Sequence, residues 1–99
     1  MYINGEYMNT LYDLYQTLET RISADPITSY TARLLQSGED EIVKKIGEEA
    51  IEIILATKGQ GDQRLVEEIS DLTYHILVLL VQKGIPLSAI SDELNKRKK

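Results

Sequence analysis

The 99-residue chain contains no cysteine, no tryptophan and no phenylalanine, and it has only two prolines. The absence of cysteine excludes a disulfide scaffold and thiolate metal sites, and it is typical of a reducing compartment, so we expect a cytoplasmic protein. Basic residues are also scarce: 11 lysines and arginines face 16 acidic residues, for a net charge of −5. This balance argues against a nucleic-acid-binding surface. A small anionic ligand would need local cations or a metal ion.

Long apolar runs are absent as well. The longest one, ILVLLV at 76–81, is far shorter than the roughly 20 residues that cross a membrane. The N-terminus lacks a basic flank followed by an apolar run, so we expect neither a signal peptide nor a membrane anchor. With 42% hydrophobic and 27% charged residues, the chain is predicted to form one soluble globular domain. A domain of this size gains from a second copy that buries more apolar surface.

Glycine, proline and aspartate divide the chain into four long segments with helical spacing. We expect helices over about 9–23, 40–58 and 62–83, and a last one from 87 into the basic tail NKRKK. The stretch ITSYTARLLQSGED at 27–40 is predicted to be a connector with one or two helical turns. Because no segment alternates like a strand and no repeat is present, the predicted fold class is all-α.

The helix over 40–58 carries carboxylates between two apolar surfaces. At about 100° per residue, Glu49 lies on the edge of the main apolar face, Glu52 lies beside it one turn on, and Glu48 points away. Ile51 and Leu55 form a second apolar patch on the far side. The main face is formed by Ile42, Val43, Ile46, Ala50, Ile53 and Ile54.

The helix over 62–83 is apolar in almost every direction, so we expect it to be buried. Its polar residues fall within one narrow stripe: Arg64, Glu68, Asp71, His75 and Gln82. A buried carboxylate without a partner is costly, so the stripe requires a compensating cation.

Two interpretations of these acids compete. Glutamates three or four residues apart on a helix usually form a solvated face, and Lys44, Lys45, Lys58 or Arg64 could pair with some of them. Two carboxylate pairs on antiparallel neighbouring helices instead favour a divalent cation. Oxygen-only ligands select a hard ion such as Mg²⁺ or Mn²⁺. A di-iron site is not expected because the chain contains no Glu-x-x-His.

The acids also fit a known motif. EEAIE at 48–52 and EISD at 68–71 resemble the Glu-Glu-x-x-Glu and Glu-x-x-Asp motifs of the MazG-type all-α nucleotide pyrophosphohydrolases. Longer stretches, 23–56 and 64–94, are similar to the phosphoribosyl-ATP pyrophosphohydrolase family of histidine biosynthesis. SYTARLL at 29–35 lies outside the general motif and favours this branch. The resemblance covers about 9–99, which leaves 1–8 as an N-terminal extension without an assignable function.

The resemblance implies a four-helix MazG-like bundle, completion of that bundle by dimerisation, and a defined reaction. The reaction is Mg²⁺-dependent hydrolysis of 1-(5-phosphoribosyl)-ATP to 1-(5-phosphoribosyl)-AMP and pyrophosphate, with Mn²⁺ as an alternative ion. The chain is too short to include the cyclohydrolase of the next step, so we expect a separate partner for it. The resemblance assigns metal binding to Glu49, Glu52, Glu68 and Asp71.

The neighbouring residues Glu48, Lys44 and Lys45 have more open roles. Glu48 could orient a water or support a metal ligand, or it could simply pair with Lys44. Either lysine could meet phosphate oxygens, although helical lysines are more often solvated. We favour Lys45 because it points nearer to Glu49.

Four further residues are candidates for substrate contacts. Ser29, Tyr30 and Arg33 could meet the ribose phosphate that distinguishes this substrate, since arginine suits bidentate phosphate recognition. Core packing is an equal alternative for Tyr30. His75 follows Asp71 by one turn and is a candidate to support the site, or a hydrogen-bonded core residue.

Two other functions remain open at this point. A pyrophosphohydrolase that removes ordinary or damaged nucleoside triphosphates would share the acids without needing SYTARLL. A non-catalytic helical interaction module would use the acids in a salt-bridged interface. We also expect a homodimer, in which the helices over 40–58 and 62–83 pack against a neighbouring chain.

Overall fold

The computed structural model describes residues 2–98, and side chains from residue 10 onward. Over this range the chain is all-α, as predicted, and contains no strand. The predicted long helices are present, although the first begins ahead of residue 9. The helical turns predicted for the connector are present as a short helix. The elements are α1 (Tyr2–Thr20), a 3-10 turn (Arg21–Ser23), α2 (Tyr30–Ser37), α3 (Glu39–Ala56), α4 (Asp62–Lys83) and α5 (Leu87–Lys96).

The loop between α1 and α2 is organised by its own hydrogen bonds. Asp25 precedes a proline, which disfavours further helix, and its Oδ1 accepts from the Ile27 N–H at 2.8 Å. Ser29 then caps α2, because its Oγ accepts from the Ala32 N–H at 3.1 Å. The position of α2 against α3 and α4 follows from this loop.

Glycines form the turns at both ends of α4. Gly59 and Gly61, with φ of 93° and 89°, allow the tight reversal from α3 into α4. At the other end Gly84 is left-handed, with φ of 71°, and the Ile85 N–H donates to the Leu80 carbonyl at 2.9 Å. This is the bond of a Schellman motif, which ends the helix cleanly.

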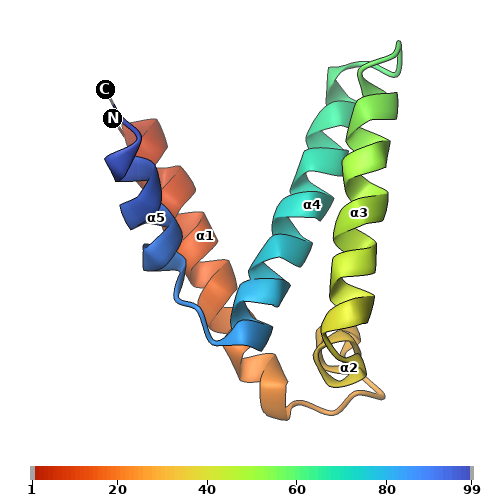
Figure 1. The fold of residues 1–99 in the computed structure, drawn as a ribbon, viewed down its shortest axis with the longest axis vertical. Helices are drawn as coiled ribbons and strands as arrows, with labels where there is room; N and C mark the ends of the chain where they lie inside the picture. Colours follow the sequence, from red (N-terminus) through yellow and green to blue (C-terminus); the bar gives the residue numbers. More distant parts are fainter. Residues whose placement is uncertain (1, 99) are drawn as a thin grey trace.

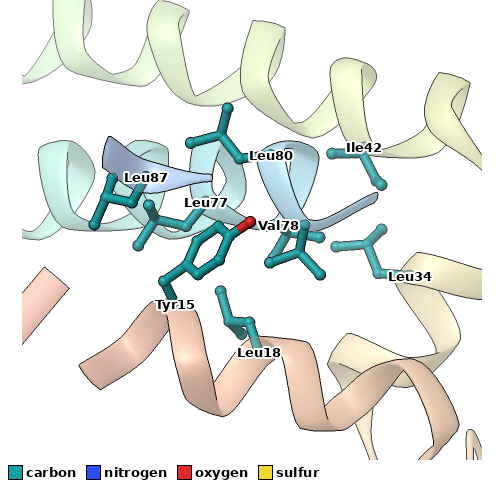
Figure 2. Packing of buried hydrophobic residues seen from close by; sticks show 9 residues of the cluster. Tyr15, Leu18, Leu34, Ile42, Leu77, Val78, Leu80 and Leu87 are labelled. Atoms are coloured by element: carbon teal, nitrogen blue, oxygen red, sulfur yellow. The ribbon is translucent and has the colours of Figure 1, made fainter. Parts of the chain in front are cut away.

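The core gathers where α1, α2 and α3 meet the C-terminal half of α4 (Figure 2). Ile42 and Val78 are fully buried there. The Tyr15 hydroxyl donates to the Ile85 carbonyl at 2.6 Å, which ties α1 to the loop between α4 and α5. Burial, and then the nearby Glu19, raises the pKa of Tyr15. The buried apolar side chains of this cluster are Tyr15, Leu18, Leu34, Ile42, Leu77, Val78, Leu80, Val81 and Leu87.

The α3–α4 hairpin extends beyond this core. Figure 1 shows α3 and α4 side by side, with α1 and α5 diverging from them and α2 at the foot of the hairpin. The prediction that α4 is buried along its whole length is therefore wrong for its N-terminal half, where Val66 is 56% exposed and Ile69 is 45% exposed. On α3, Val43 and Ile54 of the predicted core face are exposed as well. For Val66, Ile69 and Ile54, the reason is that α1 and α2 cover only the other end of the hairpin.

No single helix in the described part of the chain has the length and hydropathy to span a membrane. The pair α4 and α5 would satisfy these criteria together, by length and composition only, but the two helices are bent by 111° at their break.

Candidate active site

The five acids singled out in the sequence lie on the two helices of one hairpin. Glu48, Glu49 and Glu52 belong to α3, and Glu68 and Asp71 belong to α4. These two helices are joined by a tight turn and make the most extensive contact in the molecule. The hairpin therefore brings acids from both motifs to the same pair of facing helices.

Glu68 is the most deeply buried acid of the site, at 4% exposure. Its Oε2 lies 2.6 Å from Arg64 Nη2, one turn earlier on α4. Arg64 also contacts Glu67 at 3.1 Å. The hydrogen bond with Glu67, then the charges of Glu68 and the more distant Glu52, raise the pKa of Arg64. Arg64 is therefore the cation that compensates for the burial of Glu68.

Glu49 is held by a buried histidine. Its Oε1 lies 2.7 Å from His75 Nδ1, and the same nitrogen lies 3.0 Å from the Asp71 carbonyl oxygen. Because both of these oxygens are acceptors, Nδ1 carries the proton and donates. In the neutral ring, Nε2 then accepts from the Tyr30 hydroxyl at 2.9 Å. A continuous hydrogen-bonded chain thus runs from α2 through α4 to Glu49 on α3.

The remaining acids are accessible to solvent. Glu52 and Asp71 are exposed, and so is Glu48, whose Oε1 lies 3.9 Å from Lys45 Nζ. The sequence suggested Lys44 as the partner of Glu48, but the structure pairs Glu48 with Lys45. An exposed pair at this distance contributes little to stability.

The donor set fits a hard divalent cation in its chemistry. Glu49, Glu52, Glu68 and Asp71 offer only carboxylate oxygens, which Mg²⁺ and Mn²⁺ prefer. As the side chains stand, no three His, Asp or Glu residues within the described range converge into a metal-binding group. Gathering the four around one ion requires side-chain rotation. The metal assignment therefore stays a prediction.

A cavity of about 190 Å³ lies next to this hydrogen-bonded chain, between α2 and α3. Arg33 lines this cavity. Its guanidinium lies 5.9 Å from the Tyr30 ring centre, and its Nη1 donates to the Pro26 carbonyl at 2.9 Å. Burial, followed by the proximity of Tyr74 and Glu49, raises the pKa of Tyr30. We call this space the α2–α3 cavity; it is lined by Tyr30, Arg33, Leu34, Ser37, Glu41 and Lys45.

The predicted substrate residues are thus divided between this cavity and other places. Tyr30, Arg33 and Lys45 line it, whereas Ser29 spends its hydroxyl on the cap of α2 and Lys44 is exposed on α3.

The comparison with protein families decides the affiliation. Residues 11–98 match the family model of phosphoribosyl-ATP pyrophosphohydrolase. The chain belongs to the phosphoribosyl-ATP pyrophosphohydrolase family. This confirms the resemblance carried by the two acidic motifs and by 29–35.

Individual family members are similar over most of their length. The phosphoribosyl-ATP pyrophosphatase of Trichlorobacter lovleyi is 49% identical over 85 residues, covering 86% of this chain and 79% of the relative. The protein of the same name from Listeria monocytogenes serotype 4a is 49% identical over 87 residues, covering 88% and 84%. That of Clostridium botulinum strain Kyoto is 44% identical over 90 residues, covering 91% and 82%.

Three residues near the candidate site were not predicted from the sequence. Ser37 and Glu41 line the α2–α3 cavity, and Tyr74 packs its ring against His75 with centroids 5.2 Å apart. Glu41 was detectable, because it lies one turn before Lys45 on the same face of α3. Ser37 and Tyr74 gave no signal, since their roles depend on where α2 docks.

Proposed function

We propose that this chain hydrolyses 1-(5-phosphoribosyl)-ATP to 1-(5-phosphoribosyl)-AMP and pyrophosphate, the second step of histidine biosynthesis. The observation that carries the proposal is the family match over residues 11–98, which includes both acidic motifs. The hairpin that holds those motifs on facing helices supports it. The product would pass to a separate cyclohydrolase.

Glu49, Glu52, Glu68 and Asp71 would hold Mg²⁺, or Mn²⁺ in its place. The ion supplies charge neutralisation at the phosphoryl oxygens and lowers the pKa of a bound water. The chain itself supplies orientation. His75 fixes one oxygen of Glu49, and Arg64 forms an ion pair with the buried Glu68.

Cations at the edge of the site would meet the substrate's phosphates. Lys45 pairs only loosely with Glu48, so its ammonium is available to a phosphate oxygen, and Glu48 is then free to orient the attacking water. Lys44 is exposed on the neighbouring position and offers a weaker contact of the same kind. Arg33 and Tyr30 are the candidates for contact with the second ribose of the substrate, that of its 5-phosphoribosyl group. Ser29 acts through the cap of α2.

A homodimer is part of the proposal. The outer part of the α3–α4 hairpin leaves apolar side chains on both helices open to solvent, among them Ile51 at 58% and Leu55 at 47% exposure. A second copy that covers this end of the hairpin would bury them beside the acids. Exclusion of water strengthens the electrostatic interactions of such a site.

A nucleotide panel tests the proposed function. Purified protein with Mg²⁺ is given 1-(5-phosphoribosyl)-ATP, ATP and several other nucleoside triphosphates, and pyrophosphate release is measured. The proposal expects kcat/KM for 1-(5-phosphoribosyl)-ATP to exceed the others by at least about 100-fold, as when binding groups for one substrate feature go unused. Equal rates on ordinary triphosphates would favour the broader pyrophosphohydrolase, and no turnover of any nucleotide would favour an interaction module.

A further inference from the structure

The α2–α3 cavity and the acid Glu49 are connected through one residue. Tyr30 lines the cavity, and its hydroxyl is hydrogen-bonded to His75, which in turn donates to Glu49. We propose that this cavity binds the 5-phosphoribosyl group of the substrate, an inference that rests on the proposed function. Tyr30 and His75 then couple the occupancy of the cavity to the position of Glu49.

The charges at the cavity suit a sugar phosphate. Arg33 and Lys45 offer two cations, and arginine can bind phosphate through two parallel hydrogen bonds. The cavity also contains Glu41, whose carboxylate would repel a bare anion but accepts hydrogen bonds from sugar hydroxyls. A ligand that carries both a phosphate and hydroxyls therefore matches this lining better than inorganic phosphate does.

The size of the cavity agrees with this class of ligand. A water needs only about 10–15 Å³ of such space, whereas this cavity offers about 190 Å³. A phosphate with part of its ribose fits that space. Lys45 lies one turn before Glu49 on α3, so a ligand in the cavity reaches the edge of the acidic site.

The coupling follows from how tightly His75 is enclosed. Its ring meets Tyr30 edge to face, with centroids 6.1 Å apart, and it meets Tyr74 in the same way at 5.2 Å. Tyr74 is itself hydrogen-bonded to Thr31 on α2. Because the imidazole is clamped between α2 and α4, a ligand that orders Tyr30 also fixes the nitrogen that holds Glu49. Tyr30 and His75 are thus positioning residues, and Arg33 is a binding residue.

The binding part can be tested without metal or turnover. Ribose 5-phosphate is titrated into the metal-free full-length chain and followed by amide chemical shifts. We expect saturable shifts at α2 and around Glu49, weaker binding of inorganic phosphate, and at least tenfold weaker ribose 5-phosphate binding in Arg33→Gln, as expected when a charge-assisted hydrogen bond is lost. Arg21→Gln is the control, since Arg21 is exposed on the 3-10 turn and contacts the Thr20 hydroxyl. Unchanged binding in Arg33→Gln, or no binding to the wild type, overturns the subsite.

The coupling part predicts a division between KM and kcat. Arg33→Gln should raise KM for 1-(5-phosphoribosyl)-ATP about tenfold or more with little change in kcat. Tyr30→Phe keeps the ring and removes the hydroxyl, so kcat should fall about tenfold with KM nearly unchanged. Tyr12→Phe, an exposed tyrosine on α1, is the matched control.

The outcomes separate this inference from the proposed function. A wild type that releases no pyrophosphate from 1-(5-phosphoribosyl)-ATP contradicts the proposed function, whereas the ribose 5-phosphate titration still decides the subsite. An active wild type with unchanged KM in Arg33→Gln contradicts the subsite alone. An unchanged kcat in Tyr30→Phe contradicts the coupling alone.

Discussion

Both halves of α4 carry apolar side chains, but the surroundings of these side chains are very different. In the C-terminal half, Leu77 and Val78 are buried against α1 and α3. In the N-terminal half, Val66 and Ile69 are exposed, while the charged Glu68 is buried. One half stabilises the fold of a single chain, and the other holds the acids and leaves its apolar surface uncovered. The hydrophobic pattern alone does not distinguish these roles.

The largest expected effect concerns the charged half. Glu49→Gln or Asp71→Asn should reduce pyrophosphate release by more than the roughly 10- to 100-fold typical of residues that only support a metal ligand. The fold should remain intact, or gain stability in metal-free buffer, because a crowded negative charge is removed. Activity assays and thermal unfolding check both points. Glu67→Gln is the control, since Glu67 contacts Arg64 from the exposed side; wild-type turnover in Asp71→Asn would refute the site.

The next effect compares apolar truncations in the two halves. Leu77→Ala should lower the free energy of unfolding by about 2–5 kcal/mol, because it opens a cavity in the core. Ile69→Ala should cost less than about 1 kcal/mol at dilution, where no second copy covers it. Urea unfolding at several protein concentrations measures both. If Ile69→Ala matched Leu77→Ala at the lowest concentration, the division of α4 into two halves would be wrong.

Leu55→Glu should affect assembly more than folding. Leu55 lies on the outer surface of α3, so a charge there is tolerated in a monomer but not in a buried interface. Light scattering at micromolar concentration should give a dimer mass for the wild type and a monomer mass, or aggregation, for the variant. A fully active wild-type monomer would contradict the dimer.

Glu48→Gln should have the smallest effect on turnover. Glu48 is exposed and loosely paired with Lys45, so its loss should reduce kcat by no more than the roughly 10- to 100-fold typical of residues that only support a metal ligand. The kcat values of Glu48→Gln and Glu49→Gln are compared in one kinetic series. A loss as large as that of Glu49→Gln would mean that Glu48 points into the site after all.

The long helices, and the two among them that carry the acids, could be predicted from the sequence, because helical periodicity and glycine turns are local features. The sequence was not sufficient for contacts that depend on docking. Ile54 matched a core face, yet it is 60% exposed. The contact of Tyr30 with His75 joins residues 45 positions apart, and no local pattern predicts it.

The central claim is that the acids of the α3–α4 hairpin act through a divalent cation. It is tested most directly with one preparation of wild-type protein, whose pyrophosphate release from 1-(5-phosphoribosyl)-ATP is measured in excess EDTA and again after Mg²⁺ is restored. The account predicts loss of activity in EDTA and its return with Mg²⁺. Undiminished turnover in EDTA would contradict it.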